Sequence, residues 1–260
     1  MGIINKELRR KIVDIITNAG EGHIPSSFSI IDIINYLYKN VLIYNPKKPK
    51  WDKRDYFILS KGHGAAALYV TLNKYKFLTD KILKTYSTNN SILGGHPDST
   101  KVPGVEASTG SLGHGFPTAV GIAKGIQIQN KKNRIFCLVG DGECQEGSLW
   151  EAANIASNFG LTNIFCIVDW NKSAKQLMQI ENLRQRWESF GWETSSCNGH
   201  SNNEFNEYFN KKLRKNLKKP QVLILNTIKG KGVPFMEGHG SWHHKIPNQI
   251  EYDQIMKFLK

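Results

Sequence analysis

The fold is decided by RIFCLV at residues 134–139, which is followed by Gly140-Asp141-Gly142 and then by NIFCIV at residues 163–168. Both runs are apolar and typical of buried strands, and residues 148–159 between them have a helical pattern. Strand, helix and strand in this order form a βαβ unit, whose strands lie parallel in a sheet covered on both faces. We therefore expect an α/β fold, with a parallel central sheet flanked by helices.

Further elements extend this unit in both directions along the chain. Helical patterns cover residues 5–19, 28–39, 64–77, 115–129, 182–190, 202–217 and 249–259, and strand-like runs cover 56–60, 192–196 and 221–227. Residues 87–112 and 229–247 are rich in turn-forming residues and are predicted to be irregular. Because long loops in a compact domain are usually functional, residues 87–112 are a candidate for a site. Without an evident linker or repeat, residues 1–260 are predicted to form a single domain.

Composition excludes several classes of protein. The chain has 260 residues, of which 40% are hydrophobic and 22% charged, as in ordinary globular proteins. No apolar run is long enough to span a membrane, and MGIINKELRRKIVD at the N-terminus lacks the apolar core of a signal peptide. The four cysteines form no CxxC pair. A reduced, cytoplasmic location is therefore expected, without a disulfide framework or a zinc site.

The net charge of +13 permits binding to nucleic acid. However, the lysines are spread along the chain and accompanied by many asparagines, which indicates compositional bias more than a nucleic-acid interface. We keep nucleic-acid binding as the alternative outside enzymology, and expect no nucleic acid or membrane partner. The same charge favours anionic small molecules such as phosphates.

Six of the eight histidines directly follow a glycine: His23, His63, His96, His114, His200 and His239. Glycine allows unusual backbone conformations and close approach of a ligand, and histidine exchanges protons near neutral pH. One such pair is most simply a turn histidine bonded to the backbone, but the whole set indicates a polar active site. Metal binding by the histidines is disfavoured because HxH and HExxH spacings are absent.

An anion and metal site is predicted at the end of the first buried strand. Gly140, Gly142 and Glu143 surround Asp141 there, where backbone N–H groups and a following helix would favour phosphate. Asn171 follows the next strand. If the two strands are neighbours, the Asp141 carboxylate and the Asn171 amide oxygen enter one crevice and suit Mg²⁺ held partly by phosphate oxygens.

Taken together, these residues resemble the N-terminal part of the transketolase family, specifically the short subunit of split transketolases. The matching motifs are GHIPSS (22–27), SKGHG (60–64), GGHPD (94–98), STGSLGHG (108–115), GDGECQEGSLWEAANIA (140–156), DWNK (169–172), FGW (190–192), NGH (198–200) and GKGVPFM (230–236). The spacing from Gly140 to Asn171 fits the family's thiamine diphosphate signature. The resemblance runs nearly from end to end and implies the thiamine diphosphate-binding fold.

The resemblance implies roles for individual residues. Metal ligands would be Asp141, Asn171 and the backbone carbonyl of Ser173, with Mg²⁺ or another divalent cation such as Ca²⁺ or Mn²⁺. The implied cofactor contacts are His63, Gly110, Ser111, Leu112, Gly140, Asp141, Gly142, Glu143, Glu146, Asn171 and His243. The implied catalytic residues are His23, His63, His96 and His243. His239 is the other candidate for the C-terminal site histidine, and Glu146 resembles a glutamate at the family's subunit interface.

The implied activity is transfer of a two-carbon ketol unit from a ketose or ketose phosphate to an aldose acceptor. The implied partner is a C-terminal transketolase subunit that supplies the pyrimidine-binding module and an activating glutamate, in an α2β2 heterotetramer. The alternatives are another thiamine diphosphate enzyme, such as a deoxyxylulose-phosphate synthase or an E1-type decarboxylase component, and a non-catalytic scaffold. GHIPSS and SKGHG favour transketolase.

Three departures from the family pattern stand out. Ser111 and His114 replace the proline and glutamine of STGPLGQG, and Asn198 stands where DGH would place aspartate. The segment after Asn171, SAKQLMQIENL, is shorter than in many relatives. This segment contains Ser173, whose backbone carbonyl is one of the implied metal ligands.

Overall fold

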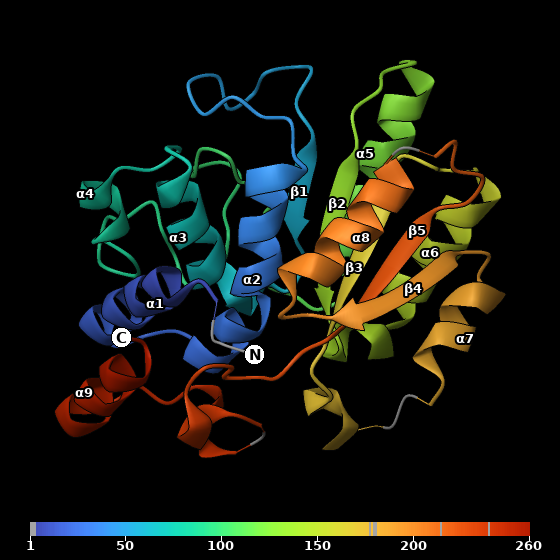
Figure 1. Ribbon diagram of the computed structural model, residues 1–260. Coiled ribbons are helices and arrows are strands. Elements are labelled where there is room, and N and C mark those ends of the chain that lie inside the picture. The colour runs from blue at the N-terminus through green and yellow to red at the C-terminus, as the bar shows by residue number, and fades with distance from the viewer. Residues whose placement is uncertain (1–3, 177, 179–180, 214, 239) are drawn as a thin grey trace.

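A five-stranded parallel sheet forms the centre of the computed structural model, which describes residues 4–260 except 177, 179–180, 214 and 239 (Figure 1). The strands are β1 (Tyr56–Leu59), β2 (Ile135–Gly140), β3 (Ile164–Trp170), β4 (Glu193–Asn198) and β5 (Gln221–Asn226). Their order in space is β1-β2-β3-β5-β4, so β5 lies between β3 and β4. The predicted α/β class with a parallel sheet is confirmed.

The two strands of the predicted βαβ unit are direct neighbours. Ile135 pairs with Ile164, and the register continues to Gly140 opposite Asp169. Alternate side chains enter opposite cores: Phe136 and Leu138 join one apolar cluster, and Cys137 joins the other. A run that is apolar at every position is therefore explained by burial on both faces.

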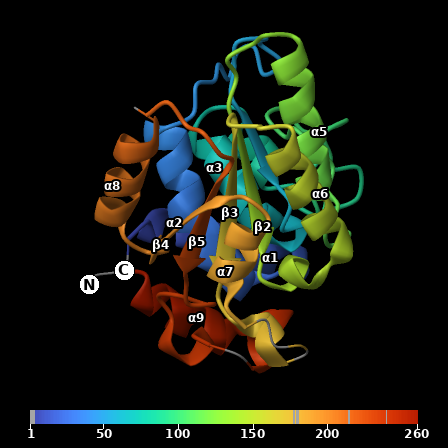
Figure 2. The same cartoon turned by 90° about the vertical axis from the view of Figure 1, so that its right-hand side faces the viewer.

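Helices cover both faces of the sheet (Figure 2). One side carries α1 (Lys6–Ala19), α2 (Ile24–Asn40), α3 (Ala65–Lys74) and α8 (Asn202–Leu213), and the other carries α5 (Gly115–Ile128), α6 (Gly147–Asn158) and α7 (Leu183–Ser189). Two peripheral helices are α4 (Asp80–Leu83) and α9 (Gln249–Phe258). Short 3-10 turns are η1 (Gly62–Gly64), η2 (Gly142–Gln145), η3 (Ser173–Gln176), η4 (Pro234–Met236) and η5 (Ser241–His243).

Most predicted elements occur within a few residues of their expected bounds. The helix predicted over 28–39 begins earlier, at Ile24, with Pro25 in its first turn, where a missing N–H costs nothing. The helices predicted to reach residues 77 and 217 end at Lys74 and Leu213. The one-turn helix α4, capped by Thr79, was not predicted because four residues carry no periodic signal.

The cysteines lie in the interior of the protein. Cys137, Cys144, Cys166 and Cys197 are all buried with free thiols. Burial raises the pKa of the Cys197 thiol to about 12. Within the described residues, no helix combines the length and apolarity needed to cross a bilayer.

Candidate functional site

Polar residues gather at the carboxyl edge of the sheet. Lys61 and His63 follow β1, Asp141 follows β2, and Asn171 follows β3. The segment after β5 brings Lys229 to the same edge, and the red C-terminal segment runs along it in Figure 1. Ligands of parallel α/β sheets bind at this edge, so the topology places the predicted residues where a site is expected.

Asp141 and Asn171 lie on loops that are bonded to each other. Asp141 Oδ2 accepts a hydrogen bond of 3.0 Å from the backbone N–H of Ala174, three positions beyond Asn171. Asn171 Oδ1 accepts one of 2.9 Å from the Ser173 N–H. The two predicted metal ligands therefore share one loop junction at neighbouring strand ends. Burial raises the pKa of Asp141, which a bound cation would offset.

Asp169 orients the Asn171 amide. The Asn171 Nδ2 group donates a hydrogen bond of 3.0 Å to Asp169 Oδ2. Since a carboxylate only accepts, this contact fixes the amide with its nitrogen toward Asp169 and its oxygen on the opposite side. A carboxylate behind an amide ligand is the arrangement expected of a metal site's supporting residue.

Lys61 and Asp169 form an ion pair that is enclosed by the protein. Lys61 Nζ lies 2.5 Å from Asp169 Oδ2, and the two side chains are 3% and 0% exposed. Lys61 Nζ also donates to the Ser26 carbonyl and to Ser29 Oγ, both at 3.1 Å. Burial alone would raise the pKa of Asp169, but Lys61 and the neighbouring hydroxyl groups hold it below its usual range. Both residues lie within the family motifs, but neither was predicted to have a role in the site.

Three predicted catalytic histidines form one cluster. The His23 ring centroid lies 5.3 Å from that of His63 and 5.3 Å from that of His243, and His63 lies 6.2 Å from His243. His23 Nδ1 donates to the His243 carbonyl at 3.0 Å. Lys229 Nζ lies 2.6 Å from His243 Nδ1. The structure therefore places His243 in the cluster, while the rival candidate, His239, lies outside the described residues.

The surroundings of these three histidines favour the uncharged form of each imidazole. Burial lowers the pKa of His23 to about 4, and it lowers that of His63 well below 6.5, with Lys61 adding to the effect. The pKa of His243 is lowered by burial and then by Lys229. Burial and the Lys61 charge lower the pKa of Lys229 to about 8. Near neutral pH these histidines are uncharged, so each ring has one N–H donor and one acceptor nitrogen.

His96 lies with a different group of loops. Its ring packs against Gly110, where an added Cβ would lie 3.2 Å from His96 Cδ2. Gly62 in turn packs against the Gly110 backbone so closely that an added Cβ would lie 2.8 Å from its nitrogen. The loops with SKGHG, GGHPD and STGSLGHG therefore contact one another. Among the described residues, no ring contact joins His96 to His23, His63 or His243.

The Glu143 side chain connects neighbouring loops of the site through hydrogen bonds. Its fully buried carboxylate accepts hydrogen bonds from the Ser60 hydroxyl, the Gly140 N–H at 2.9 Å and the Gly113 N–H at 3.2 Å. Burial raises its pKa. Because protein donors surround it, we interpret Glu143 as a brace that shapes the phosphate-binding loops; direct cofactor contact by Glu143 stays an untested prediction.

The other predicted contacts surround this brace. Glu146 precedes α6 and packs beside Gly113, where an added Cβ would lie 2.6 Å from Glu146 Cβ. Leu112 is 41% exposed, and its carbonyl accepts a 2.9 Å hydrogen bond from His114 Nδ1. Ser111 is also exposed. Their roles, and that of the Ser173 carbonyl, stay predictions.

A second buried charge network was missed. Asp32 accepts two hydrogen bonds of 2.8 Å from Arg9 and one of 2.8 Å from His200 Nδ1. His200 Nε2 accepts the Ile228 N–H at 2.9 Å, which ties this network to the segment that carries Lys229. These partners lie far apart in sequence, so only the G-H pattern of His200 signalled them. His200 therefore supports the segment that carries Lys229, and it is not part of the cluster formed by His23, His63 and His243.

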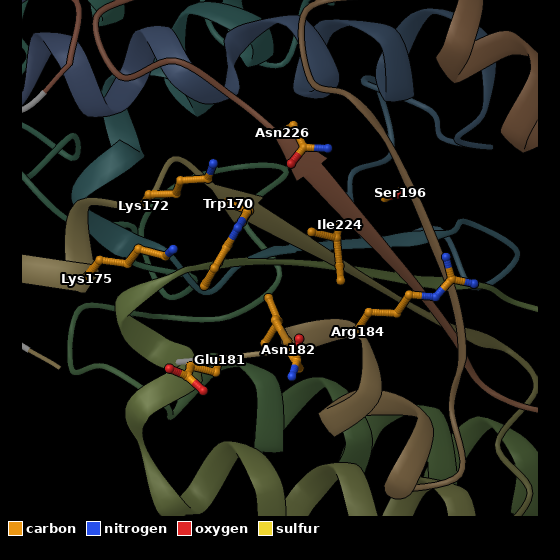
Figure 3. Close-up of a pocket in the computed structure, with 10 residues that line it drawn as sticks. Trp170, Lys172, Lys175, Glu181, Asn182, Arg184, Ser196, Ile224 and Asn226 are labelled. Atoms are coloured by element: carbon orange, nitrogen blue, oxygen red, sulfur yellow. The ribbon is translucent and has the colours of Figure 1, made fainter. Parts of the chain in front are cut away.

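A separate pocket of about 530 Å³ lies beside the loop that contains Asn171 (Figure 3). It is lined by Trp170, Lys172, Lys175, Glu181, Asn182, Leu183, Arg184, Ser196, Ile224 and Asn226. None of the predicted site residues lines it, although Trp170 and Lys172 flank Asn171. The shortened segment after Asn171 therefore borders this pocket.

The donor set at the sheet edge fits a divalent cation and a diphosphate. Asp141 and Asn171 supply hard oxygens, as Mg²⁺ requires, while Gly142 leaves open space beside them, since an added Cβ would meet only Ala174, at 4.0 Å. Within the described residues, no group of three or more His, Cys, Asp or Glu side chains could hold a metal by itself. A site with few protein ligands suits a cation that shares phosphate oxygens.

Comparison with known proteins identifies the family. Residues 3–255 match the family model "Transketolase, thiamine diphosphate binding domain". The chain is 40% identical to a subunit of the apulose-4-phosphate transketolase of Actinobacillus succinogenes, over 98% of this chain and 94% of that protein. It is 37% identical to the protein of the same name from Phocaeicola vulgatus, over 96% of this chain and 90% of that protein.

Solved structures agree with this assignment. Transketolase from Campylobacter jejuni superposes with a TM-score of 0.90 at 32% identity, which covers 97% of this chain. The chain spans 41% of the length of that transketolase. The thiamine diphosphate-binding fold expected from the motifs is therefore confirmed. The chain belongs to the transketolase family, in which it matches the N-terminal, thiamine diphosphate binding part.

Proposed function

We propose that this chain is the N-terminal subunit of a split transketolase, active with thiamine diphosphate and a divalent cation, of which Mg²⁺ is favoured. The observation that carries the proposal is the junction at the ends of β2 and β3, where Asp141 is bonded to the loop that presents Asn171. Asp141, Asn171 and the Ser173 carbonyl would hold the cation, and Gly142 and His63 would contact the diphosphate.

The bound cofactor would supply an electron sink that allows a C–C bond of a ketose to break and the two-carbon unit to be transferred. The chain's own part is to bind, orient and exchange protons. In this proposal, uncharged His23, His63 and His243 would accept a proton from a substrate hydroxyl and return one to a substrate oxygen. Lys61 and Asp169 hold the supporting loops in place.

Sugar substrates and a second chain complete the proposal. The two bacterial relatives are named as subunits, which implies separate second chains in those enzymes, and both are named for apulose 4-phosphate. We propose a C-terminal partner that supplies the pyrimidine-binding module and an activating glutamate, in an α2β2 assembly in the cytoplasm. Ketose phosphates are the proposed donors and aldoses the acceptors.

The test is reconstitution of this chain with a C-terminal transketolase subunit from the same organism. The mixture with thiamine diphosphate and Mg²⁺ should transfer a two-carbon unit between sugar phosphates, whereas neither chain should do so by itself. Decarboxylation of pyruvate without ketol transfer would instead support another thiamine diphosphate enzyme. Ketol transfer by this chain alone, or cofactor binding by neither the chain nor the mixture, would contradict the proposal.

A further inference from the structure

We propose that a groove beside Trp51 is a docking site for an acidic segment of a partner protein. The groove has a volume of about 520 Å³ and lies between two loops, residues 44–54 and residues 98–107. It is lined by Lys48, Pro49, Lys50, Trp51, Ser99, Lys101, Val102 and Pro103. None of these residues has a part in the proposed reaction.

The groove lies at the edge of the sheet opposite the proposed active site. Residues 44–54 lead into the amino end of β1, whereas Lys61 and His63 follow its carboxyl end. In Figure 1 this loop is drawn in blue above β1, and the red C-terminal segment runs along the other edge. A partner in the groove would therefore not compete with the cofactor or with the proposed second subunit.

A bidentate ion pair joins the two loops that form the groove. Arg54 Nε and Nη2 donate to the two carboxylate oxygens of Glu106, both at 2.7 Å, and these side chains are 12% and 13% exposed. Arg54 Nη1 also donates to the Trp51 carbonyl at 2.9 Å. One guanidinium therefore connects the loop that carries Trp51 to the loop that carries Val102.

Backbone hydrogen bonds also fix each wall of the groove separately. In the first loop, the Trp51 N–H donates to the Lys48 carbonyl at 2.9 Å. In the second loop, the Val102 N–H donates to the Asp98 carbonyl at 3.0 Å. Because neither wall has to fold when a partner arrives, the entropic cost of binding is reduced.

The charges on the first loop indicate which kind of partner fits. Four lysines occur among residues 45–53, namely Lys47, Lys48, Lys50 and Lys53. Asp52 is the only carboxylate in that stretch. Within the described part of the chain, none of the four lysines forms an ion pair with a carboxylate. Their ammonium groups give the rim of the groove a positive potential, which attracts carboxylates.

The second loop adds one more lysine to the rim. Lys101 Nζ lies 3.4 Å from Asp98 Oδ2. The other oxygen of Asp98 accepts hydrogen bonds from the Thr100 N–H at 2.9 Å and from the Thr100 hydroxyl at 2.6 Å. Asp98 is therefore bound within its own loop, where it holds Lys101 beside the groove and leaves the lysines of the first loop unpaired.

Apolar residues between these lysines suit one bulky side chain. Pro49 and Trp51 are partly exposed, Pro103 is exposed, and Val102 is 3% exposed. Protein partners gain most of their affinity where an apolar anchor enters a pocket, while charged residues at the rim select the partner. We therefore specify the occupant as an extended peptide with acidic residues on both sides of one bulky apolar residue.

Nucleic acid fits this groove less well than an acidic peptide. Single strands bind through several aromatic side chains on which bases stack, along a continuous basic track. Among the described residues that line the groove, Trp51 is the only aromatic one. The guanidinium of Arg54, in the same loop, is already paired with Glu106. Exposed lysines around one apolar pocket match a short acidic segment.

Fluorescence anisotropy with a designed peptide tests the proposed chemistry. The probe is the labelled peptide Ser-Glu-Glu-Phe-Glu-Glu-Ser, and the protein is the full chain. One control peptide has glutamine in place of every glutamate, and the other has alanine in place of phenylalanine. We expect the probe to bind at least about tenfold more tightly than either control, because both charge and anchor contribute. Added salt should weaken binding of the probe.

Variants of the chain show where the probe binds. Lys48→Glu combined with Lys50→Glu reverses the charge of the rim and should weaken binding at least about tenfold. The matched control is Lys218→Glu combined with Lys219→Glu, an exposed pair before β5, which should change binding by less than about twofold. Both double variants should keep the urea midpoint of the wild type, because all four lysines are exposed.

Nuclear magnetic resonance provides a second measure of where the probe binds. The indole N–H resonance of Trp51, assigned with Trp51→Phe, should move as the probe is added. The indole N–H of Trp187, which is fully buried elsewhere in the protein, should stay in place.

Three results would overturn the inference. The first is equal weakening by the two double variants, which would show general attraction to a basic protein. The second is absence of probe binding, or binding without movement of the Trp51 resonance. The third is an oligothymidine strand that binds more tightly than the probe and is lost in Lys48→Glu with Lys50→Glu, which would assign the groove to nucleic acid. None of these measurements depends on ketol transfer, so failure of the proposed function would leave them unaffected.

Discussion

The polar groups at the sheet edge form two regions, which differ in whether their charged groups are paired with a partner of opposite charge. In the inner region, Lys61 pairs with Asp169 and Arg9 pairs with Asp32, and all four side chains are at most 3% exposed. In the rim, His23, His63, Lys229 and His243 contact one another, and within the described part of the chain none of them forms an ion pair with a carboxylate. The inner region therefore holds paired charges, whereas the histidines of the rim are uncharged near neutral pH.

This difference teaches which residues hold the site and which are placed to act. A buried ion pair gives directional support, since removing one partner leaves a charge without compensation. Lowered pKa values in the rim instead keep the imidazoles uncharged near neutral pH, so each ring offers one N–H donor and one acceptor nitrogen. Substitutions in the inner region should therefore affect stability first, and those in the rim should affect chemistry first.

The largest effect on stability is expected from Lys61→Met. This change leaves Asp169 buried with only hydroxyl and amide donors, and should lower the free energy of unfolding by about 3 kcal/mol. Urea unfolding of the purified chain measures it. Lys211→Met, on the exposed side of α8, is the matched control and should stay within about 0.5 kcal/mol. Equal effects of the two changes would show that Lys61 contributes no more to stability than a surface lysine, which would contradict the prediction.

An intermediate effect is expected from Asp141→Ala, at the boundary of the two regions. The fold should survive at a cost of about 1 kcal/mol, the loss of two backbone hydrogen bonds being partly offset by relief of a buried carboxylate. Thiamine diphosphate affinity in the assembled enzyme, measured calorimetrically with Mg²⁺, should fall by at least about 100-fold. Asp52→Ala, an exposed loop position, should leave it unchanged. Unaltered affinity in Asp141→Ala would remove the metal assignment.

The smallest effect concerns the stability of the rim at low pH. The pKa of His23 is about 4 in the folded protein and 6.5 in the unfolded chain, so the unfolded state binds more protons between these values. Stability should therefore fall as pH drops below 6.5 and level off near pH 4. His23→Gln should remove this component, which we expect to be below about 1 kcal/mol because the ring is partly exposed to solvent. Identical urea midpoints for both proteins between pH 7 and 5 would contradict the prediction.

The sequence predicted the fold class, but it did not predict the order of the strands in the sheet. Apolar runs identified β2, β3 and β5, because strands covered on both faces are apolar at every position. The insertion of β5 between β3 and β4 could not be predicted, since periodicity reports burial and not the neighbour of a strand. The edge strand β4, with its mixed burial, gave the weakest signal.

Site residues that belong to short local motifs could be predicted from the sequence. Residues whose role depends on a partner far away in the chain could not. G-D-G followed by Asn171, and the Gly-His pairs, signalled Asp141, His23 and His63. Lys61 and Asp169, 108 positions apart, gave no such signal, because any lysine or aspartate reads as a surface charge until its partner is known. Lys229 was hidden for the same reason.

The five-residue segment 227–231 has a consequence for how this chain can change over time. Each of its residues is tied to a different part of the protein, namely Asp169, His200, Gly238, Pro25 and Arg9. Inserting or deleting one residue there would break several ties together and withdraw Lys229 from His243. We therefore expect natural variation in loop length to be absent from this segment and to accumulate instead beyond Asn171, in the stretch that borders the open pocket.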